Sequence, residues 1–239
     1  ITSETCALDI IDADFVRDVE PGEIIIIDDK GLQSIKPFAK SIPRFCIFEY
    51  IYFARPDSII DGKSVYEVRK KIGAELAREN NIMADVVVPV PDSGVPSAIG
   101  YAQTAGIPFE LGIIRNHYVG RTFIEPTTEI RHLGVKLKHN ANIATLKGKK
   151  VVLVDDSIVR GTTAVKIVEM IRRAGASSIH MRIASPPITH PCFYGIDTPQ
   201  QNELLAAFHS AEEIANFIGV DSIAYISEKG LYRAVGVNN

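Results

Sequence analysis

Short segments that are apolar at nearly every position alternate with longer segments of helical periodicity, and this alternation limits the possible folds more than any other feature. The stretches 84–91, 149–156 and 178–185 have the composition of strands buried on both faces. The segments 64–80 and 162–175 repeat apolar residues every three or four positions, as amphipathic helices do. The sequence therefore predicts an α/β protein whose parallel sheet is covered by helices on both faces.

Other segments extend this pattern. We expect further strands at 22–29, 45–54, 107–114 and 222–227, and further helices at 97–106 and 210–219. The inward stripes of the two long helices contain Val65, Val68, Ile72 and Leu76 in one, and Ala164, Ile167, Val168 and Ile171 in the other. A length of 239 residues suits one large domain or two small ones.

Charge and cysteine content exclude several classes of protein. The formal net charge is −3, so no general attraction to nucleic acid or anionic membranes is expected. The run of four isoleucines at 24–27 is too short to span a bilayer. The three cysteines are far apart and odd in number, which argues against a disulfide framework and favours a reducing, cytoplasmic compartment. We expect Cys6 to be a small buried apolar residue.

The stretch VVLVDDSIVRGTT, residues 151–163, places two adjacent carboxylates at the end of a predicted buried strand. Ligands of such sheets bind beyond the carboxyl ends of the strands. The polar turn that follows contains Gly161 and leads into a helix N-terminus, whose free N–H groups favour an anion. The pattern predicts a phosphate cradle beside an acid pair. For an acid pair alone we would favour a solvated strand end and an ordinary helix cap.

Two other polar segments belong near the same edge. The turn PDSG, residues 91–94, follows the strand at 84–90, although its spacing alone also fits a plain β-turn. The long segment 115–140 contains five basic residues and two acidic ones, which suits the binding of pyrophosphate, and some of these residues belong to a solvated charged loop.

The 151–163 stretch closely resembles the phosphoribosyl pyrophosphate (PRPP) motif of type I phosphoribosyltransferases. Together with EYIYFARPDS, VPVPDSGVPSAIGYA, RNHYVGRTFIEP and HPCFYGIDTP, it is similar to the amidophosphoribosyltransferase family over essentially the whole chain. The resemblance implies a mostly parallel twisted sheet with helices on both faces, a small hood and a flexible loop. It also implies that residues 1–34 are the tail of a glutaminase domain and that residues 35–239 form the phosphoribosyltransferase domain.

The resemblance implies a reaction in which ammonia, supplied from glutamine, replaces pyrophosphate at C1 of PRPP to give phosphoribosylamine, the first step of purine synthesis. Asp155, Asp156 and Arg121 match catalytic positions, and Mg²⁺ would be held by Ser93, Asp155 and Asp156. The loop at 115–140 would close over PRPP and exclude water. The matching PRPP-binding positions are Asp92, Ser93, Gly94, Ser157, Ile158, Val159, Arg160, Gly161, Thr162, Thr163, Lys136 and Lys138.

The sequence departs from the family pattern in two places. Cys46 and Cys192 resemble two of the four ligands of a [4Fe–4S] cluster, but the C-x-x-C pair that supplies the other two has no match, so we expect no stable cluster. The N-terminal cysteine that hydrolyses glutamine in this family is also unmatched, because residue 1 is Ile1. We therefore expect a fragment or a separated synthase portion, whose synthase activity would use free ammonia.

The resemblance further implies purine nucleotides as feedback inhibitors and a homo-oligomer, with no nucleic-acid or membrane partner. Two alternatives remain open. A non-catalytic PRPP-sensing module on the same fold would be supported by a basic DNA-binding appendage, and the sequence shows none. A receiver-type signalling domain with an acidic pocket would not need the Gly-Thr-Thr phosphate loop.

Overall fold

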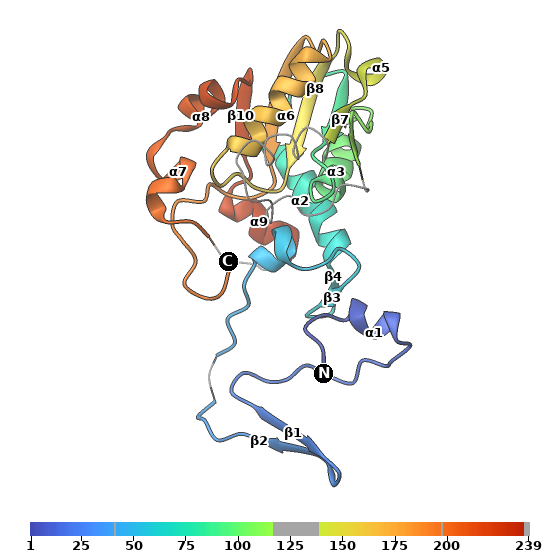
Figure 1. Cartoon of the computed structure of the whole chain (residues 1–239), viewed down its shortest axis with the longest axis vertical. Coiled ribbons are helices and arrows are strands. Elements are labelled where there is room, and N and C mark those ends of the chain that lie inside the picture. The colour runs from blue at the N-terminus through green and yellow to red at the C-terminus, as the bar shows by residue number, and fades with distance from the viewer. Residues whose placement is uncertain (41, 117–138, 197, 237–239) are drawn as a thin grey trace.

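The computed structural model describes residues 1–40, 42–116, 139–196 and 198–236. A four-stranded parallel sheet forms the centre of the molecule (Figure 1). Its strands stand in the order β10 (Ser222–Tyr225), β9 (Ser178–Ile183), β8 (Lys150–Asp155) and β5 (Val86–Pro89). The predicted parallel sheet is therefore confirmed.

Helices cover both faces of this sheet. In β8, Val151 and Leu153 belong to one core cluster, while Val152 and Val154 belong to the other. This division explains why the strand is apolar at every position between its ends. The first cluster is completed by α6 (Thr162–Arg173) and α8 (Ala211–Ile218), and the second by α2 (Val65–Glu79), α3 (Val95–Ala105) and α9 (Glu228–Val235).

The predicted helices form where their apolar stripes and caps indicate. All four residues of each predicted inward stripe are buried. The Ser64 side chain accepts a hydrogen bond at the start of α2, and Ser210 and Glu213 form a capping box at the start of α8. α3 ends at Gly106, whose φ of 69° is the left-handed conformation common after helices.

The strand predicted at 45–54 is wrong, and the strand predicted at 107–114 is shortened. Segment 45–54 contains a π-helical turn at Glu49–Phe53 instead of a strand, because the buried Arg69 guanidinium binds the carbonyls of Tyr50 and Ala54 and holds the backbone in a turn. Segment 107–114 makes one isolated bridge to β5 and becomes a strand only at its end, in β6 (Ile113–Arg115). β6 pairs antiparallel with β7 (His139–Ala141) outside the parallel sheet.

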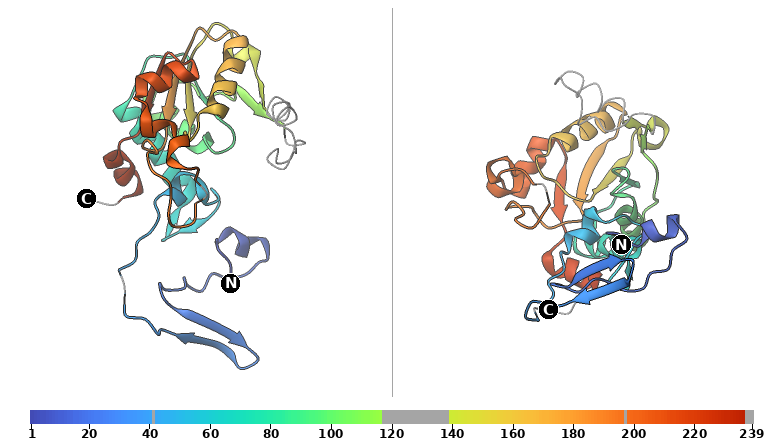
Figure 2. Two further views of the ribbon diagram at one scale, coloured as in Figure 1. Left: turned by 60° about the vertical axis from the view of Figure 1, so that its left-hand side comes forward. Right: turned by 60° about the horizontal axis from the view of Figure 1, so that its bottom comes forward.

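The N-terminal residues extend away from the sheet. The strand predicted at 22–29 forms as β1 (Ile24–Asp28), but it pairs only with β2 (Gly31–Ile35) in an antiparallel hairpin. The hairpin lies apart from the central sheet in Figures 1 and 2. The short helix α1 (Cys6–Ile10) remains near the main body, and Cys6 is buried as predicted.

The remaining elements are short. They are β3 (Ile59–Ile60), β4 (Lys63–Ser64), α5 (Ile143–Leu146), η3 (Gln201–Glu203) and α7 (Leu205–Phe208). Among the described residues, no helix has the length and apolar character needed to cross a bilayer.

Candidate functional site

The predicted turn at 91–94 meets the end of β8 at the carboxyl edge of the sheet. The Val90 N–H donates to the Val154 carbonyl at 2.8 Å, and the Gly94 N–H donates to the Val90 carbonyl at 3.0 Å. The Ser93 hydroxyl is a hydrogen-bonding partner of the Asp156 carboxyl group. The structure therefore brings the PDSG turn and the acid pair together, as the sequence predicts.

The acid pair carries an electrostatic cost in the absence of a ligand. Asp155 is the last residue of β8, and Asp156, the residue after it, is 6% exposed. Burial raises the pKa of Asp155 well above its ordinary value, and the charge of Asp156 raises it further. Burial also raises the pKa of Asp156, partly offset by hydrogen bonds from Ser157 and Ser93. A cation or several hydroxyl groups at this place would stabilise the ionised pair.

A buried arginine that sequence reasoning missed acts on the same carboxyl group. Arg69 is 3% exposed, and its positive charge partly offsets the rise that burial causes in the pKa of Asp156. Its guanidinium donates to the Tyr50 carbonyl at 2.8 Å and to the Ala54 carbonyl at 2.7 Å. The sequence contains one sign that this arginine is buried: Arg69 directly follows Val68, next to the apolar stripe of a predicted amphipathic helix. Arg69 thus links the 49–54 turn to the acid pair.

The predicted phosphate cradle follows the acid pair. Gly161 has a φ of 74°, a left-handed conformation that favours glycine, and α6 begins at the next residue. The exposed Thr162 and Thr163 lie in the first turn of α6, where backbone N–H groups lack intrahelical acceptors. The Ile158 side chain is buried in the core, so that residue offers a ligand only its backbone. This arrangement has the features of an anion site at a helix N-terminus, as the sequence predicts for residues 157–163, and the binding of an anion there stays a prediction.

The other predicted site residues make ion pairs, cap a helix or lie outside the described part of the chain. Asp92 forms an ion pair with Arg115, and Arg160 forms one with Glu203 at 2.8 Å. Gly94 caps the start of α3, and a Cβ atom there would lie 2.6 Å from the Val154 carbonyl oxygen. Arg121, Lys136 and Lys138, and with them most of the predicted closing loop, lie outside the described residues.

The chemistry of this donor set fits a hard divalent cation. Two carboxyl groups and a nearby serine hydroxyl are the oxygen ligands that Mg²⁺ prefers. The described part of the chain contains no cluster of three or more His, Cys, Asp or Glu side chains placed to hold a metal ion. A Mg²⁺ ion at Asp155, Asp156 and Ser93 would therefore need oxygen atoms from water or from the substrate, as Mg²⁺ commonly does.

The two cysteines that resemble cluster ligands differ in environment. Cys46 is exposed. Among the described residues, it belongs to no group of three or more side chains that could hold a metal ion. The Cys192 thiol accepts a hydrogen bond from the Tyr194 N–H at 3.3 Å, and backbone N–H groups at 194–196 lower its pKa. The described residues contain three cysteines, so they do not by themselves supply the four ligands of a [4Fe–4S] cluster.

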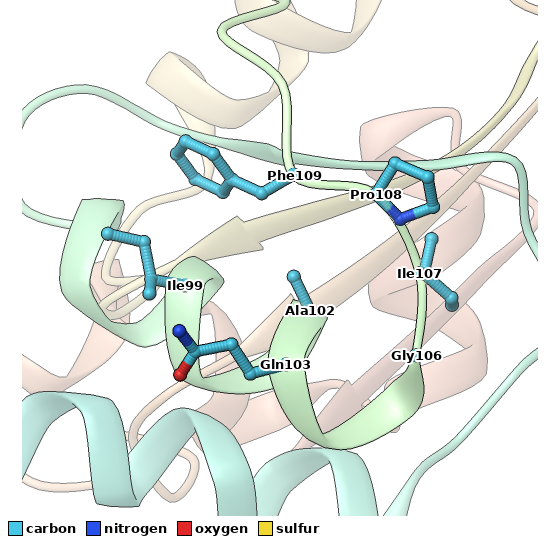
Figure 3. A pocket seen from close by; sticks show the side chains of 7 residues that line it. All are labelled: Ile99, Ala102, Gln103, Gly106, Ile107, Pro108 and Phe109. Carbon is cyan, nitrogen blue, oxygen red and sulfur yellow. The ribbon is translucent and has the colours of Figure 1, made fainter.

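A shallow apolar hollow of about 490 Å³ lies elsewhere, between α3 and the segment that follows it (Figure 3). Gln103 is the one polar side chain among the residues labelled there. Such a lining offers nothing that would bind a phosphate or a metal ion. The residues around it are Ile99, Ala102, Gln103, Gly106, Ile107, Pro108 and Phe109.

Comparison with known proteins gives a consistent family assignment. The family model of the phosphoribosyl transferase domain matches residues 57–184. An amidophosphoribosyltransferase of Rhizobium etli is 62% identical over 240 residues, which is 98% of this chain and 48% of that protein. An amidophosphoribosyltransferase of Archaeoglobus fulgidus is 56% identical over 98% of this chain and 51% of its own length.

A solved structure from Bacillus subtilis is also similar. It is described as a glutamine phosphoribosylpyrophosphate amidotransferase complexed with ADP and GMP. It superposes with a TM-score of 0.88 at 54% identity and covers 98% of this chain and 51% of its own. The chain thus spans about half the length of the relatives it matches.

Proposed function

The chain belongs to the phosphoribosyltransferase family, and from this premise we propose that it is the phosphoribosyl-transfer portion of an amidophosphoribosyltransferase. Its reaction would transfer an amino group to C1 of PRPP, releasing pyrophosphate and forming 5-phosphoribosylamine. The observation that carries this proposal is the acid pair, with Asp155 partly buried and Asp156 buried, in the same loop as the Gly161 turn that begins α6. PRPP carries hydroxyl groups next to a 5′-phosphate, which is the combination these two features suit.

Each part of the site has a role in this proposal. The carboxylates of Asp155 and Asp156 accept hydrogen bonds from the ribose hydroxyls. The backbone and hydroxyl groups of residues 157–163 donate to the 5′-phosphate. The 91–94 turn adjoins the pyrophosphate, and Arg121, Lys136 and Lys138 are proposed to neutralise that group. Residues Ser93, Asp155 and Asp156 would hold Mg²⁺, which supplies positive charge to the departing pyrophosphate.

The chemistry needs no side-chain nucleophile. The ammonia nitrogen forms a bond to C1 as the bond from C1 to the pyrophosphate oxygen breaks, and that electron pair leaves with the pyrophosphate. The amine then loses a proton to solvent. This chain's own groups bind and orient the sugar, and placing the reactants contributes to the rate. With ammonium salt as the nitrogen source, the rate should rise with pH as ammonium loses its proton and becomes nucleophilic ammonia.

Several wider features belong to the same proposal. Residues 1–34 would be the tail of a glutaminase domain and residues 35–239 the phosphoribosyltransferase domain. The apolar side chains exposed on the hairpin agree with a surface covered by further protein; they are Ile24, Ile26, Ile27, Leu32 and Ile35. We also propose a cytoplasmic homo-oligomer, with purine nucleotides as feedback inhibitors because the similar Bacillus structure contains ADP and GMP.

The test is release of pyrophosphate from PRPP by the purified chain, with ammonium salt and Mg²⁺, across a range of pH. Turnover that rises with pH and is lost in the Asp155→Asn/Asp156→Asn variant would support the proposal. PRPP binding without turnover would favour a non-catalytic PRPP sensor. Visible absorption and an iron content that match a [4Fe–4S] cluster would contradict our expectation that Cys46 and Cys192 do not hold such a cluster in this chain.

A further inference from the structure

Three consecutive residues of the phosphate loop contact one short segment that lies between β9 and α8. The Val159 carbonyl accepts a hydrogen bond from the Leu205 N–H at 2.9 Å. Arg160 Nε donates to Glu203 Oε2 at 2.8 Å. At Gly161, a Cβ atom would lie 2.8 Å from Leu205 Cδ2, so the leucine side chain covers the Cα atom of that glycine.

The contacting segment is itself anchored. Leu204 is 1% exposed, and Leu205 packs against the core cluster on the α6 and α8 face of the sheet. Gln201 Nε2 donates to the Thr189 carbonyl at 3.2 Å and ties the start of the segment to the chain after β9. A segment fixed in this way can hold the loop that it contacts in one conformation.

We propose that residues 203–205 set the conformation of the phosphate loop, and that Leu205 is a positioning residue for binding of the PRPP 5′-phosphate. This inference rests on the proposed function for the identity of the ligand. Leu205 is not proposed to touch the phosphate. Its backbone holds Val159 and its side chain packs over Gly161, so the first N–H groups of α6 keep the direction needed to meet an anion.

The glycine explains why a leucine suits this place. With a φ of 74°, residue 161 turns the chain into α6, and a side chain at 161 would have to share space with Leu205 and with Phe217, whose Cε1 would lie 3.2 Å from the added Cβ. The Arg160–Glu203 pair is about half exposed on both sides, so it contributes less than the two Leu205 contacts.

The experiment compares Leu205→Ala with two controls. Phe208→Ala changes the same helix at a residue that is 65% exposed, and Leu205→Met keeps the volume of the side chain. Hydrogen exchange of residues 157–164 in the ligand-free protein should be faster in Leu205→Ala and unchanged in both controls. The KM for PRPP should rise about tenfold, with kcat for ammonia at saturating PRPP within about twofold. If Leu205→Ala does not fold, Leu205→Val takes its place.

A double-variant cycle tests the contact itself. Gly161→Ala should weaken PRPP binding because its Cβ displaces Leu205 and because the left-handed backbone becomes strained. In Gly161→Ala/Leu205→Ala, the combined loss of affinity should be smaller than the product of the two single losses by a factor of about three or more. If the two single losses of PRPP affinity multiply in the double variant, as they do for independent sites, the result would contradict a contact between residue 161 and Leu205.

The two proposals fail in different ways. Wild-type exchange rates and a wild-type KM in Leu205→Ala would overturn the positioning role while leaving PRPP as the ligand. Faster exchange of residues 157–164 in Leu205→Ala, with no PRPP binding by the wild-type chain, would support the positioning of the loop and remove the proposed function.

Discussion

The two loops at the carboxyl edge of the sheet are held in different ways. The 91–94 turn after β5 is fixed by backbone contacts, since Gly94 lies directly against the Val154 carbonyl and α3 behind it crosses α2 closely. The 155–163 loop after β8 contains the acid pair and is held by a backbone hydrogen bond and by side chains of the 203–205 segment. The first loop therefore depends on close packing, and the second also contains two carboxyl groups whose charge is only partly offset by Arg69 and the neighbouring serine hydroxyls.

This difference shows where the site depends on its ligand. Backbone packing around the 91–94 turn does not change when a charged substrate binds. Burial raises the pKa values of Asp155 and Asp156, which disfavours their ionised forms, and a cation or the ribose hydroxyls would favour ionisation. The comparison thus predicts that substitutions that disturb helix packing behind the first loop lower the stability of the protein. Substitutions that remove a carboxylate from the second loop should stabilise the ligand-free protein and abolish binding of PRPP.

The largest loss of stability is expected from Gly100→Ala, behind the first loop. The new Cβ would lie 1.9 Å from the Lys70 carbonyl oxygen, so α3 and α2 would have to separate. Overpacking of this kind costs about 1–3 kcal/mol, or more where backbone must move. Thermal unfolding should show a fall in Tm of about 2–4 °C for each kcal/mol.

Gly106→Ala is the matched control for that prediction. Gly106 has a positive φ of 69°, but no atom lies within 4 Å of the place that a Cβ atom would take, so this variant measures the backbone strain without a clash. The left-handed backbone costs an L residue about 1–2 kcal/mol, which is the expected loss for this variant. A Tm for Gly100→Ala equal to or above that of Gly106→Ala would contradict close helix packing as the support of the first loop.

The next effect is a gain in stability on removing charge from the second loop. The pKa of Asp155 is raised above its ordinary value of 3.8, so the folded protein holds this proton more tightly than the unfolded chain does. The resulting stability is present at pH below 3.8 and is lost as pH rises through the raised pKa. Asp155→Asn cannot ionise, and it should raise the Tm of the ligand-free protein at pH 7 by a few degrees.

Unfolding curves across pH provide the measurement. The difference in Tm between Asp155→Asn and wild type should be small in acid and should grow toward neutral pH. A lower Tm for Asp155→Asn at pH 7 would show that the ionised carboxylate is stabilised by the fold, against our account of the second loop. Added Mg²⁺ should raise the Tm of the wild type and have little effect on the variant.

The smallest effect is expected from Asp92→Asn in the first loop. Asp92 is exposed and its ion pair with Arg115 is at the surface, where such pairs contribute about 0–1 kcal/mol. The Tm of the ligand-free protein should change by no more than about 4 °C. A larger change, together with a strong dependence on salt, would mean that charge also holds the first loop, and the contrast between the loops would disappear.

The sequence predicts the central sheet well because its strands are buried on both faces and its helices have clear stripes and caps. It predicts the acid pair and the Gly161 turn for the same local reason, since these residues are adjacent in the chain. The turn at 49–54 could not be predicted this way. Its conformation depends on Arg69, a residue about 15–20 positions away, while its aromatic and β-branched composition favours a strand.

Long-range contacts also explain what was missed at the site. Ser93 and Asp156 are joined by the sheet, and the general rule for parallel sheets was enough to place them together. The partners of the phosphate loop follow no such rule, because Glu203 and Leu205 come from the connection between β9 and α8, about 40 residues further along the chain. No residue pattern in that connection marks it as part of the site.

Calorimetric titration with PRPP tests the central claim most directly, because it measures the ligand on the acid pair without requiring turnover. We expect the wild-type chain to bind PRPP in the presence of Mg²⁺ and about tenfold more weakly without it. The Asp155→Asn/Asp156→Asn variant, which loses two charge-assisted contacts, should bind about 100-fold more weakly or not measurably. Equal affinity for wild type and variant, with and without Mg²⁺, would contradict the assignment of this edge of the sheet as a PRPP site.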